Sequence, residues 1–332
     1  MTPRQRLQKV FDREIPDRVP HFELVFQLEQ EAFGLSWPTP EEVGRASAAE
    51  RETLLERTFT IWERIIDRYD WCAIALPADL CGHFDGEVIP RGRRRFGDRV
   101  MIYSFNGQGT FWMPSGEEMM DFVVKLFEEP ERVHTEARTK MADSIELARR
   151  QVDQGVDFIC INSDYGYNQG PFISPTMFAE FVTPYLEQIV ARMHEFGTKA
   201  ILHSDGDLRL VLDQLVSTGL DGYQSIDPQG HMDIAEVKHR YGDRLILMGN
   251  VQASLLQEVD EGRIRESVRY AMTHGKPGGG FIFSTSNCVF KGMPLESYHI
   301  MLDEYARHAT YNEAERATRG APRAPGGNNG NS

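Results

Sequence analysis

The sequence predicts an α/β protein, a (β/α)8 TIM barrel with an antiparallel hairpin inserted early in the chain. Short apolar runs, several of them rich in Ile, Val and Phe, are each followed by a helical pattern. The runs are too short for buried helices, and Gly, Pro, Asp or Asn bounds them. Strands that alternate with helices imply βαβ units and therefore a parallel sheet that is apolar on both faces.

Seven apolar runs are predicted as strands, which leaves one strand of the barrel unplaced. In chain order they are 19–25, 71–79, 157–164, 199–206, 220–227, 244–251 and 280–287. Helices are predicted near 47–69, 174–196, 208–218, 233–240, 261–275 and 295–310. The stretch 84–113 differs from these. Its sequence "GEVIPRGRRRFGDRVMIYSF" indicates antiparallel hairpin strands.

Residues 1–312 are expected to form a single domain. The chain has 332 residues, of which 41% are hydrophobic, so it can bury a large core. Residues 313–332 end in "GAPRAPGGNNGNS", a composition rich in Gly, Pro and Asn that predicts a disordered tail.

The net charge of −14 makes nucleic acid an unfavourable partner, because its phosphates would be repelled. The basic run "RGRRRFGD" at 91–98 is interpreted as a solvated hairpin, or alternatively as a contact for an anionic ligand or an acidic partner. The four cysteines are scattered without a CxxC pair, which argues against a disulfide framework. The N-terminus has no apolar leader and no run approaches a membrane span, so a cytoplasmic protein is expected.

Polar residues gather at the C-terminal ends of the predicted strands. They are Glu23, Asp79, Asp164, His203, Asp205, Asp227, Asn250 and Asn287. A polar residue at one strand end is ordinary, since it can cap the next helix. In a parallel barrel, however, the carboxyl ends of all strands converge on one face, where barrel active sites lie. The sequence therefore predicts an enzyme.

His203 and Asp205 are two residues apart, which places both side chains on one face of an extended strand. They could share a cation or a proton, since zinc accepts histidine nitrogen and carboxylate oxygen. Alternatively, Asp205 begins a turn, Asp207 caps the next helix and His203 bonds to backbone. A third zinc ligand could come from Glu23, Asp227, His231 or Cys288, and the spacing does not choose among them.

Two further strand ends suggest ligand binding. Asp79 could bind cationic or N–H groups of a ligand, or it could cap a helix. Tyr165 and Tyr167 flank Asp164 in a pattern that suits a flat or cationic ligand, and also a packed loop. GxSxG and HExxH motifs are absent, and the glycines of "GKPGGGFIFS" match neither GxGxxG nor a P-loop.

An ordered set of segments resembles the uroporphyrinogen decarboxylase superfamily. The segments are "PDRVPHFE", "FISPTMFAEFVTPYLEQI", "ILHSDGDL", "GLDGYQSIDPQGHMDIAEVKHRYGDRLILMGNV" and "PGGGFIFSTSN…MPLESY". The resemblance covers residues 1–310 and implies a (β/α)8 barrel, a site at its C-terminal face and a homodimer. It also implies one of two chemistries. One is cofactor-free decarboxylation of uroporphyrinogen; the other is methyl transfer to or from a corrinoid, usually with zinc.

The positions that mark the decarboxylases are largely changed in this chain. Those enzymes clamp an octa-acidic porphyrinogen with an arginine-rich segment, where this chain has the acidic "HFELVFQLEQEAFG". They carry a histidine seven residues before a proline, and here Asn287 stands seven residues before Pro294. Asp79 alone matches, at the position of the aspartate that gathers the pyrrole N–H groups. Uroporphyrinogen itself is therefore not the expected substrate.

The thiol-directed methyltransferases carry His-x-Cys and a later cysteine as zinc ligands. This chain has His203-Ser204-Asp205, and its later position falls on Asn287 with Cys288 one residue beyond. Asp205 therefore stands where those relatives have cysteine. The resemblance implies the shared scaffold, without the thiol chemistry. A zinc site of His203, an acid such as Asp205 or Glu23, and Cys288 stays open.

The sequence thus predicts a methyltransferase that moves a methyl group from a small O- or N-methylated compound to cob(I)alamin on a partner corrinoid protein. The catalytic candidates are His203, Asp205 and Asp79. The substrate-binding candidates are Glu23, Asp164, Tyr165, Tyr167, Asp227, Asn250 and Asn287. One alternative is decarboxylation of a tetrapyrrole or another small acid, and a second is corrinoid or tetrapyrrole binding without turnover.

Overall fold

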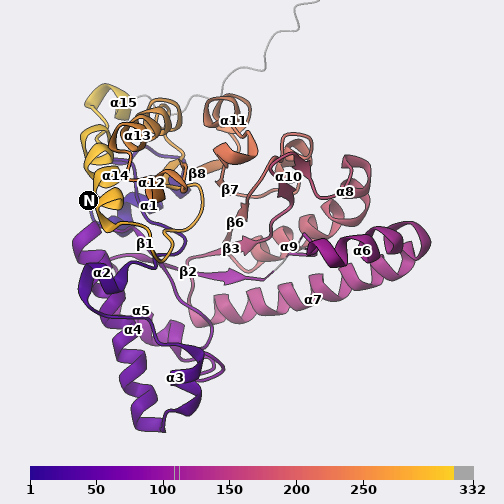
Figure 1. The fold of residues 1–332 in the computed structure, drawn as a ribbon, viewed down its shortest axis with the longest axis horizontal. Coiled ribbons are helices and arrows are strands. Elements are labelled where there is room, and N and C mark those ends of the chain that lie inside the picture. Colours follow the sequence, from indigo (N-terminus) through magenta and orange to yellow (C-terminus); the bar gives the residue numbers. More distant parts are fainter. Residues whose placement is uncertain (108, 112, 318–332) are drawn as a thin grey trace, which may run out of the picture.

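A curled sheet of seven parallel strands forms the centre of the computed structural model, which describes residues 1–107, 109–111 and 113–317 (Figure 1). The strands follow one another across the sheet in the order β1 (Ala73–Ala75), β2 (Met101–Asn106), β3 (Phe158–Asn162), β6 (Lys199–Ser204), β7 (Gly222–Ser225), β8 (Ile246–Val251) and β9 (Phe281–Thr285). Helices cover the outside of this sheet. The architecture is TIM-barrel-like, as predicted.

Residues 20–26 lie between the two edge strands of the sheet. The carbonyl of Pro20 accepts a hydrogen bond from Phe283 in β9, and the carbonyl of His21 accepts one from Cys72, just before β1. The strand predicted at 19–25 is therefore present only as isolated bridges, but it occupies the place of an eighth barrel strand.

The antiparallel hairpin predicted within 84–113 is wrong. This stretch forms helix α5 (Val88–Phe96) and then β2, which pairs in parallel with β1 and β3. The buried residues Ile89, Gly92 and Phe96 recur at helical spacing, so α5 buries one apolar face against the barrel. β2 is the strand that the sequence analysis left unplaced.

Three of the four arginines of the basic run make ion pairs within the molecule. Arg91 binds Glu52, and Arg95 binds Glu56, both on helix α4 (Ala48–Tyr69). Arg93 binds Asp157, which precedes β3. The solvated hairpin is not found, because residues 88–96 are helical. The contact with an anionic ligand or an acidic partner stays a prediction.

Helices alternate with the strands in the second half of the chain, as predicted, and further helices occur in the first half. Besides α4 and α5, they are α1 (Pro3–Phe11), α2 (Glu29–Phe33), α3 (Pro40–Arg45), α6 (Gly116–Glu128), α7 (Pro130–Gln154), α8 (Pro175–Phe181), α9 (Thr183–Glu195), α10 (Leu212–Ser217), α11 (Ile234–Tyr241), α12 (Leu255–Glu258), α13 (Glu261–Gly275), α14 (Leu295–His308) and α15 (Glu313–Ala317). The short strands β4 (Gly166–Tyr167) and β5 (Gly170–Pro171) pair with each other after β3. Within the described residues, no helix combines the length and apolarity that crossing a membrane requires.

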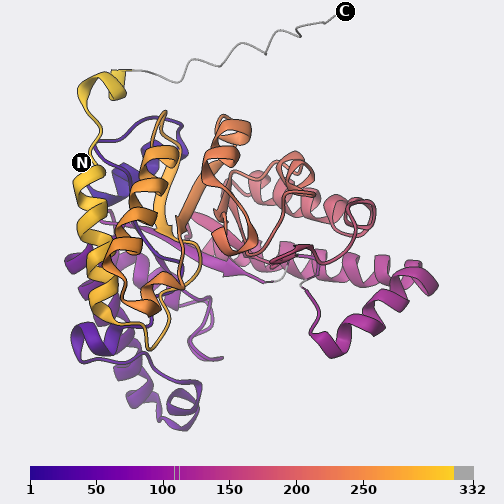
Figure 2. The same ribbon diagram turned by 45° about the horizontal axis from the view of Figure 1, so that its top comes forward.

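Helices α6 and α7 were not predicted, and Figure 2 shows them projecting to one side of the barrel. The helix α15 corrects the start of the predicted disordered tail, because residues 313–317 are helical. The rest of that predicted tail, 318–332, lies outside the described residues.

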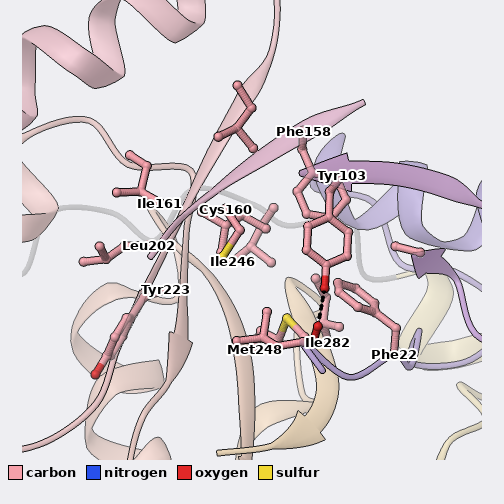
Figure 3. Close-up of a cluster of buried hydrophobic side chains, with 14 of the residues drawn as sticks. Phe22, Tyr103, Phe158, Cys160, Ile161, Leu202, Tyr223, Ile246, Met248 and Ile282 are labelled. Carbon is pink, nitrogen blue, oxygen red and sulfur yellow. Dashed lines mark hydrogen bonds between the residues drawn. The ribbon is translucent and has the colours of Figure 1, made fainter. Parts of the chain in front are cut away.

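Aromatic and aliphatic side chains fill the interior of the barrel (Figure 3). The rings of Tyr103 and Phe158 stack with their centroids 4.8 Å apart, and Phe22 packs against both. Met248 and Ile282 are also fully enclosed. The barrel is therefore a packed core, and a ligand site is expected at an end of the strands, where TIM barrels place their chemistry.

Candidate metal-binding site at the C-terminal ends of the strands

A polar cavity of about 660 Å³ opens beside the C-terminal ends of β3, β6 and β7. Its walls are formed by Met113, Asp164, Gly166, Tyr167, Asn168, Gln169, Asp205, Gly206 and Asp227. The three aspartates come from three neighbouring strand ends. Their convergence follows from the parallel sheet, which brings successive carboxyl ends to one edge.

Asp164, His203 and Asp205 form a group that could hold a metal ion, with one ligand atom from each lying within 4.8 Å of the others. The Nε2 atom of His203 is 3.6 Å from Oδ1 of Asp164 and 3.8 Å from Oδ2 of Asp205. Both distances are too long for a hydrogen bond. Two ligands that share a tetrahedral zinc, each ~2.1 Å from the ion, are separated by about 3.4 Å. The spacing and the donor types therefore fit a zinc ion.

Gln224, in β7, sets the protonation pattern of the His203 ring. Its Oε1 contacts Nδ1 of His203, while its Nε2 donates to the carbonyl oxygens of Thr285 and Ser286 at 3.2 and 3.4 Å. Because the amide nitrogen is committed to those carbonyls, Oε1 must accept the hydrogen of Nδ1. The Nε2 lone pair of His203 then points toward the two carboxylates, free to bind a metal.

Replacing Gln224 with leucine is expected to weaken zinc binding by about 10- to 100-fold, the usual effect of losing a hydrogen bond that orients a histidine ligand. The variant removes the acceptor that fixes the His203 tautomer. Competition with a zinc chelator measures the change. Unchanged zinc affinity in a folded Gln224→Leu protein would show that Gln224 does not orient the ligand.

Hydrogen bonds from neighbouring strands hold Asp205 in place. Ser225 donates to its Oδ1 at 2.5 Å, and the side chain of Asn287 donates to its Oδ2. Ser225 adopts φ = +104°, a rare conformation for a residue with a side chain. Burial raises the pKa of Asp205 to about 6, and the nearby carboxylates add to this, while His203 and the Ser225 hydrogen bond act in the opposite direction.

Three glycines allow the loops around the cavity to touch. A Cβ atom on Gly206 would lie 2.2 Å from the carbonyl oxygen of Gly166, and one on Gly230 would lie 2.2 Å from the carbonyl carbon of Gly206. Gly206 also has φ = +84°, which favours glycine. The contact between Gly206 and Gly230 joins the loops that carry Asp205 and Asp227. Because these positions are glycines, the loops can approach closely enough to bring the two carboxylates to one cavity.

Glu23 is fully buried and lies outside the group of candidate ligands found in the described residues. Its Oε2 accepts hydrogen bonds from the backbone N–H and the hydroxyl of Thr285, while its Oε1 has no partner. Burial raises the pKa of Glu23 to about 8 and lowers the pKa of His21, 4.0 Å away, to about 4. The two side chains therefore meet as neutral groups at pH 7, although their spacing resembles that of an ion pair.

The buried Glu23 predicts a pH dependence of stability. Its pKa lies near 8 in the folded state and near 4.5 in the unfolded state, so the folded chain holds more protons in that interval. Stability contributed by the protonated group is complete below pH 4.5 and is lost as the pH rises through 8. Urea unfolding is expected to show lower stability at about pH 8.5 than at about pH 6.5, and Glu23→Gln is expected to flatten this slope.

A matched control is Glu304, which is also buried but is paired with Arg265 and Arg269. These arginine hydrogen bonds lower the pKa of Glu304 despite its burial, so it is ionised throughout the tested range. Glu304→Gln is expected to leave the slope in place. If Glu23→Gln keeps the wild-type slope, the carboxyl of Glu23 is not the titrating group.

Cys288 also lies outside the group of three candidate ligands. Burial raises the pKa of its thiol to about 12, and the charges of Asp205 and Glu23 add to the effect. The sulfur is therefore a neutral thiol at neutral pH. A metal ion would have to displace the proton of this thiol in order to bind it.

The other sequence-predicted residues are distributed over separate places. Asp79 lines a mainly apolar cavity of about 430 Å³ together with Trp37 and Trp62. The backbone N–H of Gly82 donates a hydrogen bond to the Asp79 carboxylate. Asn250 lines a third cavity, of about 510 Å³, together with His231.

The two tyrosines beside Asp164 differ in their surroundings. Tyr165 is fully buried against Phe178 and Phe172, so its ring forms part of a packed loop. Tyr167 is 42% exposed and lines the 660 Å³ cavity. The structure therefore brings together Asp164, Tyr167, His203, Asp205 and Asp227, with Asn287 behind Asp205.

Gln224 and Ser225 were missed by the sequence analysis. Both lie inside the predicted strand 220–227, between Tyr223 and Ile226, and both are fully buried. Buried polar side chains inside a strand need hydrogen-bond partners, and this requirement was the available signal.

Comparisons with known proteins agree with this architecture. A family model described as "Uroporphyrinogen decarboxylase (URO-D)" matches residues 111–308. The uroporphyrinogen decarboxylase of Psychromonas ingrahamii is 26% identical over 221 residues, which are 64% of this chain and 60% of that protein. The enzyme of Pseudoalteromonas atlantica is 23% identical over 227 residues, 65% of this chain and 61% of that protein. The match thus spans about three fifths of these relatives.

A solved structure of a methyltransferase from Methanosarcina mazei superposes with a TM-score of 0.72 and 17% sequence identity. The superposition covers 92% of this chain and 99% of the methyltransferase. At this identity the likeness establishes the fold. Because the family model matches more than half of the sequence, the chain belongs to the uroporphyrinogen decarboxylase family.

Proposed function

We propose that this protein is a metal-dependent methyltransferase, which moves a methyl group from a small O- or N-methylated compound to cob(I)alamin carried by a partner corrinoid protein. The observation that carries the proposal is the position of His203 Nε2, which accepts no hydrogen bond from the described residues and lies 3.6 Å from the carboxylate of Asp164 and 3.8 Å from that of Asp205. One imidazole nitrogen and two carboxylates suit a catalytic zinc, which keeps one position for substrate. The proposed enzyme works in the cytoplasm, as a homodimer.

In this proposal the residues of the cavity have separate roles in binding the metal ion and the substrate. Asp164, His203 and Asp205 hold the ion, while Ser225 and Asn287 orient Asp205. A bound ion would act as a Lewis acid on an oxygen of the substrate, either the ether oxygen that releases the methyl group or a hydroxyl beside a methylated nitrogen. Asp227 and Tyr167 form the wall against which the substrate lies.

Asp79 has no role at the transferred methyl group in this proposal, because it lines the separate apolar cavity. That cavity, at the ends of β1 and β2, holds two tryptophans and the ring of Phe105. Asp79 stays a candidate for binding an N–H group there.

Decarboxylation of a tetrapyrrole or another small acid is the second candidate, favoured by the names of the curated relatives. A porphyrinogen with several carboxylates needs cationic side chains around it. Among the described residues, the lining of the 660 Å³ cavity contains three aspartates and neither lysine nor arginine. Corrinoid binding without turnover is the remaining alternative from the sequence.

Two parallel assays, each run on the zinc-loaded and on the metal-free protein, distinguish these candidates. The first follows the absorption of cob(I)alamin during incubation with a panel of methoxy and methylamino compounds. The second follows carbon dioxide release from uroporphyrinogen. We expect loss of cob(I)alamin with at least one donor, and no such loss in Asp164→Asn. Unchanged cob(I)alamin with every donor would contradict methyl transfer, and porphyrinogen turnover by metal-free protein would establish the second candidate.

A further inference from the structure

The charges around the 660 Å³ cavity are of one sign. Asp164, Asp205 and Asp227 line it, and the remaining lining residues are uncharged. A divalent ion held by the first two would balance their charges. The charge of the Asp227 carboxylate would stay without a counter-charge. A ligand that displaces water from this carboxylate must therefore supply a positive or hydrogen-donating group.

Asp227 is only 8% exposed, although it is an acid without an ion pair to any described residue. One oxygen, Oδ1, accepts a hydrogen bond from the backbone N–H of Gln229 at 3.0 Å. The described residues give no hydrogen bond to Oδ2. Oδ2 is not one of the enclosed side-chain oxygens without a partner, so it can be reached from the cavity that Asp227 lines. A carboxylate oxygen that is open to a cavity and free of described donors points to a cationic ligand group.

Tyr167 is a second residue in the cavity wall that favours a cationic ligand. Its side chain is 42% exposed and lines the same cavity, while the neighbouring Tyr165 is fully buried. An exposed aromatic face attracts cations, above all quaternary and methylated ammonium groups. Met113, also in the lining, offers an apolar contact for methyl groups.

We propose that the substrate of this site carries its methyl group on a positively charged nitrogen, and that Asp227 and Tyr167 select it over neutral methyl ethers. This inference rests on the proposed methyl transfer. In that reaction the C–N bond breaks and its electron pair stays on nitrogen, which departs as a neutral amine. The methyl carbon takes its new bond from the electron pair of the acceptor, cob(I)alamin, so no proton is needed for the leaving group.

The test is a direct binding experiment without any corrinoid. Isothermal titration calorimetry of the zinc-loaded protein compares choline with its neutral carbon isostere, in which a carbon atom replaces the quaternary nitrogen. The two molecules have the same shape and hydroxyl group. We expect choline to bind at least about tenfold more tightly, since a cation within ~4 Å of a half-screened carboxylate supplies that much.

Variants assign the preference to the two side chains. Asp227→Asn is expected to weaken choline binding by about tenfold, and Tyr167→Leu by about threefold, with neither changing the affinity for the isostere. Asp243→Asn is the matched control. Asp243 is an exposed acid outside the cavity, and its variant is expected to bind choline as the wild type does.

Equal affinity for choline and its isostere, no binding of either, or unchanged choline affinity in a folded Asp227→Asn protein would overturn the inference. The two proposals fail in different ways. Choline binding without any methyl transfer would contradict the methyltransferase alone. Consumption of cob(I)alamin with neutral methoxy compounds, and with no ammonium compound, would contradict the charge selection alone.

Discussion

The His203→Ala protein is expected to contain less than about 0.1 zinc per chain after reconstitution, against about one in the wild type. The imidazole is the only nitrogen donor in the candidate ligand group of the described residues. Its removal leaves two carboxylates, which bind zinc weakly in water. Metal analysis by mass spectrometry after gel filtration measures the stoichiometry.

His203 is buried, so its loss could also disturb packing. Asp164→Asn is the complementary variant, because the Asp164 side chain is 46% exposed and the substitution keeps its shape. It is expected to lower zinc affinity while the protein stays folded. His239→Ala, at an exposed position on α11, is the control and should keep its zinc. Full zinc content in His203→Ala would place the metal elsewhere.

Gly206→Ala is expected to lower the free energy of unfolding by roughly 2–5 kcal/mol, from about 1–2 for the positive φ and about 1–3 for the steric clash. The new Cβ would lie 2.2 Å from the carbonyl oxygen of Gly166, a backbone atom that cannot turn away. Relieving the clash must separate the loops that carry Asp164 and Asp205. Zinc binding is therefore expected to weaken together with stability.

Gly278→Ala is the control that measures the cost of a positive φ without a steric clash. Gly278 has φ = +77°, close to that of Gly206, but no heavy atom lies within 4 Å of its Cβ position. This variant is expected to cost only about 1–2 kcal/mol and to keep zinc. Urea unfolding of both variants provides the comparison. Equal losses of stability would show that the contact between the loops contributes nothing.

The parallel sheet was predictable because alternation of apolar strands and helices is a local pattern. The helix predicted at 261–275 is found with those bounds, and six of the seven predicted strands are found as strands. The failure at 84–113 has a physical reason. Helix α5 buries Ile89, Gly92 and Phe96 against the barrel, and a run this short with four arginines does not show from local sequence that such a packing surface exists. Its ion-pair partners on α4 lie about 40 residues away in sequence.

The sequence could predict which residues meet in the candidate site when those residues lie at the end of the same strand or at the ends of adjacent strands. His203 lies in β6, Asp205 follows its last residue with a carboxylate oxygen 3.8 Å from the His203 ring, and Asp164 follows the neighbouring β3. Asp79 follows β1, which lies three places away from β6 in the sheet. Sequence alone does not reveal how the sheet curls or where the loop after β1 runs. It therefore could not place Asp79 in a separate cavity.

The ligand roles proposed for Glu23 and Cys288 stay predictions that depend on side-chain direction. Glu23 turns toward Thr285, and burial keeps both Glu23 and the Cys288 thiol in their neutral forms near pH 7. Both residues are near the site in the fold. Burial and hydrogen bonding, which distinguish them from Asp164, are not encoded in local spacing.

X-ray absorption spectroscopy of the zinc-loaded protein tests the metal centre most directly, because it counts nitrogen, oxygen and sulfur neighbours of the ion. The donor set of Asp164, His203 and Asp205 predicts a first shell of nitrogen and oxygen only, at about 2.0–2.2 Å, with scattering from one imidazole. A sulfur neighbour at about 2.3 Å would bring Cys288 into the site and contradict this account.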